Sequence, residues 1–157
     1  MLDKLVPLIG KSIETEEIKE IFKSWNAQYP KRLFCTDLEP NVKAKVEKDC
    51  IRLYFGKGQK TTFLNPIPTS WEGGFVAILT HIEFTKKSRG GIPFDITFQM
   101  TPAELTHLLG DSVEIETDDK AKKQFWSRKV GDKHELLVED ISSASNETNR
   151  TILLRLL

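Results

Sequence analysis

Residues 100–110 encode a complete short helix, and they limit the fold more than any other part of the chain. Thr101 and Glu104 have the spacing of a capping box, in which each side chain accepts a hydrogen bond from the other residue's backbone N–H. Pro102 occupies the first helical position, where its missing N–H removes no hydrogen bond. Gly110 can end the helix in a left-handed conformation. An apolar stripe suited to cover a core is formed by Leu105, Leu108 and Leu109.

A similar helical pattern occurs in the first part of the chain. An offset of 87 residues places Glu17 on Glu104 and Ile18 on Leu105. After each helix, alternating apolar and polar residues predict a hairpin and then a third strand. In the first half the predicted strands are residues 42–47, 50–55 and 75–85. In the second half they are residues 124–130, 134–140 and 151–157.

The sequence therefore predicts an α+β fold of two tandem helix-β-β-β repeats, residues 1–89 and 90–157, which form one compact unit. Joining two antiparallel sheets edge to edge avoids leaving two open edges. We expect both helices to pack on one face of the resulting sheet. The other face would then be open, and it would be the natural surface for a partner.

Composition and charge favour a cytoplasmic protein that neither enters a membrane nor binds nucleic acid. Of 157 residues, 39% are apolar, and 23 basic residues balance 23 acidic ones, whereas nucleic-acid binders usually carry a basic excess. The first residues do not resemble a signal peptide. No apolar run approaches the roughly 20 residues that a membrane-spanning helix needs. In the cytoplasm, Cys35 and Cys50 would stay reduced.

The residue types that usually carry catalysis are not grouped in a familiar pattern. Gly10, Lys11 and Ser12 resemble the end of a phosphate-binding loop, but Leu5 stands where that loop needs a glycine. The histidines, at positions 81, 107 and 134, do not have metal-ligand spacing. Neither cysteine lies at a predicted helix start, where a thiolate would be stabilised. We therefore expect no catalytic residues, no metal and no cofactor.

A family resemblance adds a functional expectation. The segments VAILTHIEF (76–84) and GIPFDITFQMTPAELTHLLG (91–110) resemble a pattern of small bacterial proteins, and LIGKS (8–12) resembles their opening. Those proteins are similar to tandem β-lactamase-inhibitor-like or outer-membrane-assembly-lipoprotein-like repeats, and many are immunity proteins of bacterial toxin systems. The chain departs from the pattern at Asp95, where a glycine is usual, and in the insert at residues 65–74.

Two groups of residues are candidates for contact with a partner. An acidic group could meet the basic active site of a nuclease toxin: Asp111, Glu114, Glu116, Asp118 and Asp119. The alternative is a solvated connection that nearby lysines partly neutralise. A second group combines aromatic residues with an arginine, as interfaces often do: Trp71, Phe75, Trp126 and Arg128.

The aromatic group also has an alternative interpretation. Trp126 follows Phe125 in a predicted strand, so one of the two must face away from the helices. If the other sheet face is open, that aromatic side chain is exposed. The alternative is a second small core under the loop that contains Trp71.

Together these observations favour a non-enzymatic protein-binding inhibitor, an immunity protein that covers the active site of a cognate bacterial toxin domain. We expect a monomer or a weak dimer. One alternative is an assembly or scaffold module that binds another cell component, for example through an open sheet edge such as the last strand. Another is a small enzyme or ligand-binding protein with a site between the sheet and the long loop.

Overall fold

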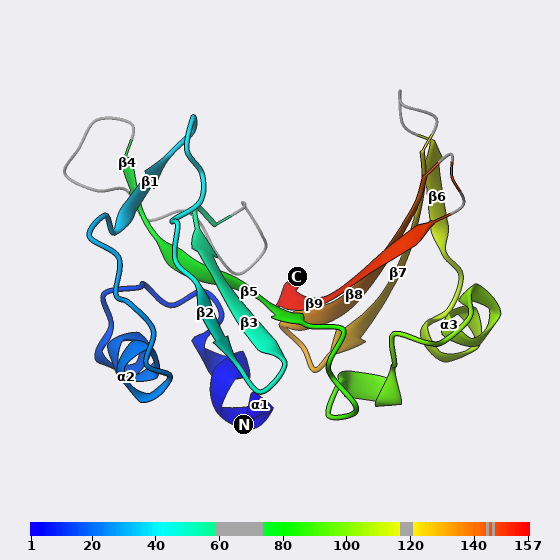
Figure 1. The fold of residues 1–157 in the computed structure, drawn as a ribbon, viewed down its shortest axis with the longest axis horizontal. Helices are drawn as coiled ribbons and strands as arrows, with labels where there is room; N and C mark the ends of the chain where they lie inside the picture. Colours follow the sequence, from blue (N-terminus) through cyan, green and yellow to red (C-terminus); the bar gives the residue numbers. More distant parts are fainter. Residues whose placement is uncertain (59–73, 117–120, 144, 146) are drawn as a thin grey trace.

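The computed structural model describes residues 1–58, 74–116, 121–143, 145 and 147–157, and it confirms the α+β class. The helical elements are α1 (Leu2–Leu5), the 3₁₀ turn η1 (Val6–Leu8), α2 (Glu16–Ser24), the 3₁₀ turn η2 (Pro93–Asp95) and α3 (Pro102–Leu109). The strands are β1 (Phe34–Thr36), β2 (Val46–Lys48), β3 (Ile51–Gly56), β4 (Gly74–Val76), β5 (Ile78–Phe84), β6 (Val113–Glu116), β7 (Lys122–Val130), β8 (His134–Ser142) and β9 (Thr148–Leu156). In Figure 1 the helices lie below a curved sheet.

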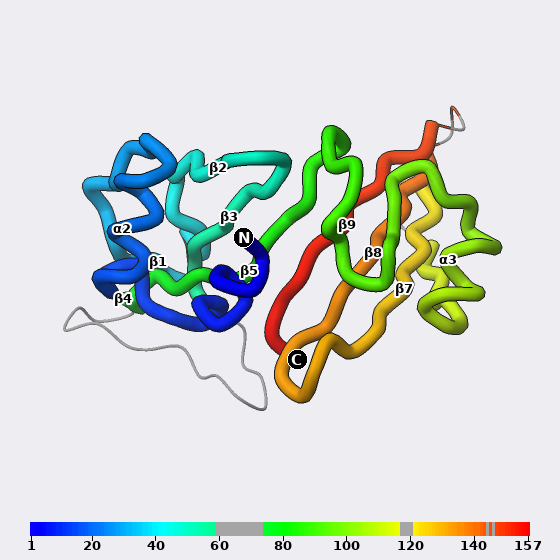
Figure 2. The backbone as a smooth tube through the Cα atoms, turned by 90° about the horizontal axis from the view of Figure 1, so that it is seen from below, coloured from blue at the N-terminus to red at the C-terminus, as the bar shows by residue number. Residues whose placement is uncertain are grey.

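Seven described strands form one antiparallel sheet in the order β2-β3-β5-β9-β8-β7-β6, and β1 pairs with β4 in a separate sheet. Strands from the two halves of the chain meet at the β5–β9 pair (Figure 2). There, Ile82 lies opposite Leu154 and Phe84 lies opposite Ile152. These four side chains are at most 3% exposed, so the seam between the halves belongs to the core.

Tight turns set the register of two hairpins. Between β2 and β3, Asp49 and Cys50 have φ angles of 47° and 70°, the left-handed conformation that a type I′ hairpin turn requires at both central positions. Between β7 and β8, Gly131 has a φ of 68°, which glycine adopts without strain. Because register decides the face on which each side chain lies, these turns also determine the composition of both sheet faces.

The helix α3 has the capping box that the sequence predicts. The backbone N–H of Thr101 donates to Glu104 Oε2 over 2.7 Å, and the N–H of Glu104 donates to Thr101 Oγ1 over 3.3 Å. Leu105 and Leu109 are buried in the same core cluster as Trp126 of β7. The indole N–H of Trp126 donates to a side chain of α3, Thr106 Oγ1, over 3.0 Å. The helix is therefore fixed on β7 by apolar contact and by a hydrogen bond.

The helix α2 contributes to the core beneath the strands of the first half. Ile18 and Phe22 are 0% and 2% exposed, and the Phe22 ring centroid lies 5.4 Å from that of Phe55 in β3. Tyr29 follows the helix and meets Phe22 edge-on at 5.1 Å. Its hydroxyl donates to the carbonyl oxygen of Ile13 over 3.0 Å, which satisfies the polar end of a partly buried side chain.

A buried ion pair holds the segment before α3 on the sheet. Arg150 of β9 donates from Nε and Nη2 to the two carboxylate oxygens of Asp140 in β8, each over 2.6 Å. Its Nη1 also donates to the carbonyl oxygens of Phe98 and Met100, over 3.1 and 2.5 Å. The side chains of Arg150 and Asp140 are 9% and 5% exposed, so the pair is largely shielded from water.

Several predicted boundaries differ from the structure. The acidic segment expected as a polar connection contains β6, because residues 113–116 pair with the start of β7. The strand predicted at residues 75–85 is interrupted at Ala77, which separates β4 from β5. Cys50 lies in a turn and not in a strand. Residues 61–64, whose sequence also suits a short strand, lie outside the described residues.

Candidate partner-binding face

The seven-stranded sheet has one face that the described helices do not cover. Cross-strand partners point to the same side of a sheet, whereas neighbours along a strand point to opposite sides. Gln124, Trp126 and Arg128 of β7 donate hydrogen bonds to α3 or to the segment that follows it, so their side of the sheet carries the helix. The alternate residues of the strands lie on the other side, which we call the open face.

Apolar side chains lie on the open face across β6, β7, β8 and β9. Phe125 is the cross-strand partner of Val113, and Leu137 is the partner of Leu153. The full apolar set consists of Val113, Ile115, Phe125, Leu137, Ile141 and Leu153. Val113 and Ile115 are 61% and 50% exposed, and the other four are half-buried. In the described chain, the hydrophobic core and the residues packed against it do not include this set.

Ion pairs lie beside the apolar set. Arg52 of β3 donates to Glu47 of β2 over 2.9 and 3.1 Å and lies 3.5 Å from Glu83 of β5. Arg155 of β9 forms a similar pair with Glu135 of β8 over 2.8 Å. Because these charges are partly exposed, each pair adds little to stability. The pairs nevertheless fix the positions of charges that a partner would meet.

His81 and Tyr54 lie between these ion pairs. Their rings stack with centroids 4.6 Å apart and planes inclined by 12°, and His81 is the cross-strand partner of Arg155. The Nδ1 atom of His81 lies 3.0 Å from Thr80 Oγ1. Burial, and to a smaller extent the charge of Arg155, lowers the pKa of His81 to about 4. The imidazole is therefore uncharged at neutral pH.

The lowered pKa of His81 predicts a loss of stability in acid. Between about pH 6.5 and about pH 4, the unfolded chain carries the His81 proton and the folded chain largely does not. The free energy of unfolding should therefore fall by roughly 3 kcal/mol as the pH decreases through that window. Urea unfolding at a series of pH values measures this loss, and His81→Gln should remove most of it. His134, whose pKa burial also lowers, is present in both proteins. Equal losses in variant and wild type would refute the prediction.

The structure corrects the assignment of Trp126. This side chain is 0% exposed beneath α3, so Phe125 is the aromatic residue that faces away from the helices. Trp126 is therefore removed from the candidate partner contacts. Arg128 also lies on the helix side, where it donates to the carbonyl oxygen of Leu108 over 2.5 Å and lies 4.4 Å from the ring centroid of Phe94.

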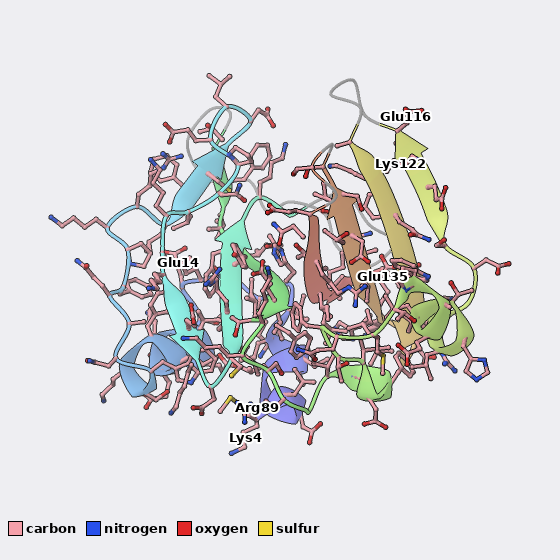
Figure 3. The ribbon with its side chains drawn as sticks, turned by 45° about the vertical axis from the view of Figure 1, so that its right-hand side comes forward. Lys4, Glu14, Arg89, Glu116, Lys122 and Glu135 are labelled. Carbon is pink, nitrogen blue, oxygen red and sulfur yellow. The ribbon has the colours of Figure 1, made fainter. Side chains whose placement is uncertain are left out.

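The remaining candidates lie in separate places. Phe75 belongs to β4 of the two-stranded sheet, and Lys57 Nζ lies 4.2 Å from its ring centroid. The described acidic candidates, all exposed on or just before β6, are Asp111, Glu114 and Glu116. Figure 3 shows Glu116 beside Lys122, its cross-strand partner at the same end of the sheet. Three candidates lie outside the described residues: Trp71, Asp118 and Asp119.

Sequence reasoning missed the charged residues of the open face. Arg52, Glu83 and Arg155 are far apart in the chain and become neighbours only through the strand order β3-β5-β9. Glu83 and Arg155 each lie between two apolar residues of a strand, and this alternation would have predicted that both side chains point away from the core. The alternation could not have shown which charges come together, because the order of strands in a sheet cannot be predicted from the residues of one strand.

The structure also locates the residue types that could support chemistry. Within the described ranges, no group of three or more His, Cys, Asp or Glu side chains is positioned to hold a metal ion. Cys35 is buried in β1, and burial raises the pKa of its thiol. Of the helices that the structure describes, none is long and apolar enough to cross a membrane.

Comparison of the chain with models of known protein families, with curated proteins and with solved structures finds no match. The open face is therefore the basis of the functional inference. That face offers fixed charges beside apolar side chains that the core does not use.

Proposed function

We propose that the chain is a non-enzymatic protein-binding inhibitor whose open face contacts its partner. The observation that carries this proposal is the apolar set of the open face, which lies outside the core and beside fixed ion pairs. Apolar side chains together with polar ones make up the usual protein–protein interface. Exposed apolar patches on soluble proteins commonly mark such interfaces.

In this proposal the chain is a pair of tandem repeats. Their sheets are joined, so the open face continues from one repeat to the other. One repeat consists of α2 with β2, β3 and β5, and the other consists of α3 with β7, β8 and β9. In each repeat a hairpin precedes a third strand, and the third strands β5 and β9 pair with each other. Pairing through third strands supports a single wide surface that a folded partner could occupy.

The proposed partner is a cognate bacterial toxin domain, and the chain is its immunity protein. The resemblance at residues 76–84 and 91–110 supports this class of partner. Asp111, Glu114 and Glu116 place negative charge at the β6 end of the sheet. Such charge would speed encounter with the basic active site of a nuclease toxin.

A variant of the open face tests this function. Leu137→Glu combined with Leu153→Glu places two carboxylates on the cross-strand pair that lies beside the ion pairs. We expect the wild type to restore growth of cells that express the toxin domain encoded beside it, and the variant to fail. Binding measured by titration calorimetry should weaken at least about 100-fold, since two apolar contacts are replaced by charges.

The matched control adds the same charge on the opposite side of the molecule. Ala103 and His107 are exposed on α3, so Ala103→Glu combined with His107→Glu should leave growth and affinity close to wild type. If only the control variant fails to restore growth, the partner contacts the helix side and not the open face. Tight binding by the wild type without growth rescue would contradict the inhibitor and favour an assembly module.

A further inference from the structure

β6 forms one edge of the seven-stranded sheet, and the whole strand is exposed. β6 ends the seven-stranded sheet, and in the described part of the chain no strand pairs with its outer edge. All four residues, 113–116, are exposed. The opposite edge of the sheet differs, since β2 has three residues and its Val46 is fully buried. An unprotected edge presents backbone N–H and C=O groups that can pair with another extended chain.

The side chains of β6 divide into an apolar side and an acidic side. Val113 and Ile115 lie on the open face and are two of the four exposed large apolar residues in the described chain. Glu114 and Glu116 lie on the other side, and no salt bridge to either is found among the described residues. A strand added to this edge would therefore meet alternating apolar and negative positions.

We propose that the outer edge of β6 accepts an extended segment of a partner protein as an additional strand, with alternating apolar and basic side chains. The basic side chains would face Glu114 and Glu116, and the apolar ones would face Val113 and Ile115. Opposite charges and apolar side chains in cross-strand positions both stabilise a pair of strands. This inference deepens the proposed function and rests on its claim that the chain binds a protein.

A second copy of the chain is a poorer occupant of the same edge. Antiparallel pairing of two β6 strands into one continuous sheet would keep the two open faces on one side. Glu114 and Glu116 of one copy would then face the same residues of the other copy, and like charges in cross-strand positions are destabilising. Charge complementarity therefore favours a basic segment over self-association.

A short peptide with the full chain tests the proposal without any toxin. The probe is an acetylated and amidated decapeptide in which lysine alternates with valine and threonine, and fluorescence anisotropy of a labelled copy measures its affinity. We expect binding at least about tenfold tighter than that of the same peptide with glutamate in place of lysine. Methylation of alternate backbone nitrogens in the lysine peptide should abolish binding, since it removes the donors that pair with β6.

Charge reversal on the protein separates this site from general attraction between charges. In Glu114→Lys combined with Glu116→Lys, the preference should reverse, so that the glutamate peptide binds more tightly than the lysine peptide. The control variant, Glu14→Lys with Glu20→Lys, makes the same charge change elsewhere and should keep the wild-type preference. Figure 3 shows Glu14 on the opposite side of the molecule from Glu116.

Each remaining outcome overturns the inference. Equal affinity for both peptides, or unchanged binding of the methylated peptide, would show that β6 does not accept a strand. If no peptide binds and the double variant Glu114→Gln with Glu116→Gln dimerises, the two glutamates serve only to prevent self-association at this edge. Because no toxin is used, failure here leaves the open-face variant and its growth test unaffected.

Discussion

Replacing Arg150 with methionine should lower the free energy of unfolding by about 3–5 kcal/mol, because the change leaves a buried carboxylate without its partner. Asp140 is 5% exposed, and both of its oxygens accept hydrogen bonds from Arg150. The carbonyl oxygens of Phe98 and Met100 would also lose a donor. Urea unfolding followed by circular dichroism at neutral pH measures the change.

Two further variants make this prediction specific to burial. Arg155→Met removes a comparable ion pair with Glu135, but Arg155 is 42% exposed, so the cost should stay below about 1 kcal/mol. Asp140→Leu combined with Arg150→Met removes both buried charges and should recover much of the lost stability. Equal costs for the Arg150 and Arg155 variants would show that the Arg150 pair is not shielded from water.

Replacing Trp126 with alanine should also lower the free energy of unfolding by about 3–5 kcal/mol, because it empties the space between α3 and the sheet. Trp126 is 0% exposed, shares the core cluster with Leu105 and donates a hydrogen bond to Thr106. Thr106→Val isolates that hydrogen bond and should cost about 1 kcal/mol. Unfolding should be followed by circular dichroism, since the variant loses a fluorescent residue.

Phe125 supplies the matched control for Trp126. It is the preceding residue of the same strand, but it lies on the open face and outside the core cluster. Phe125→Ala should therefore cost less than half as much stability as Trp126→Ala. If the two alanine variants are equally destabilised, the assignment of the two sheet faces is wrong.

The parts of the fold that could be predicted from the sequence are those fixed by local interactions. The capping box of α3 joins Thr101 to Glu104, three residues apart, and the turn at Gly131 needs only a residue that tolerates positive φ. β6 was missed because its four residues lie in an acidic stretch and are held in place by pairing with β7. Val113 and Ile115 alternate with glutamates, a pattern that indicates a strand, but the many charges of this stretch favoured a polar connection.

The candidate site could be predicted only in part, because its neighbours come from distant strands. Alternation showed that Phe125 and Trp126 face opposite ways, but only the position of α3 decides which of them is buried. The contact of Arg52 with Glu83 depends on the pairing of β3 with β5. Asp95 has a φ of 56°, a left-handed conformation that glycine adopts without strain and that the sequence pattern does not reveal.

The proposed function requires that the open face, and not the helix side, contacts the partner. Hydroxyl-radical footprinting of the free chain and of its complex with the proposed toxin domain tests this requirement directly. Phe125, Leu137 and Leu153 should be oxidised in the free chain and protected in the complex, while Trp25 and Met100 change little. Unchanged oxidation of the open face in the complex, with protection of Trp25 and Met100, would contradict the account.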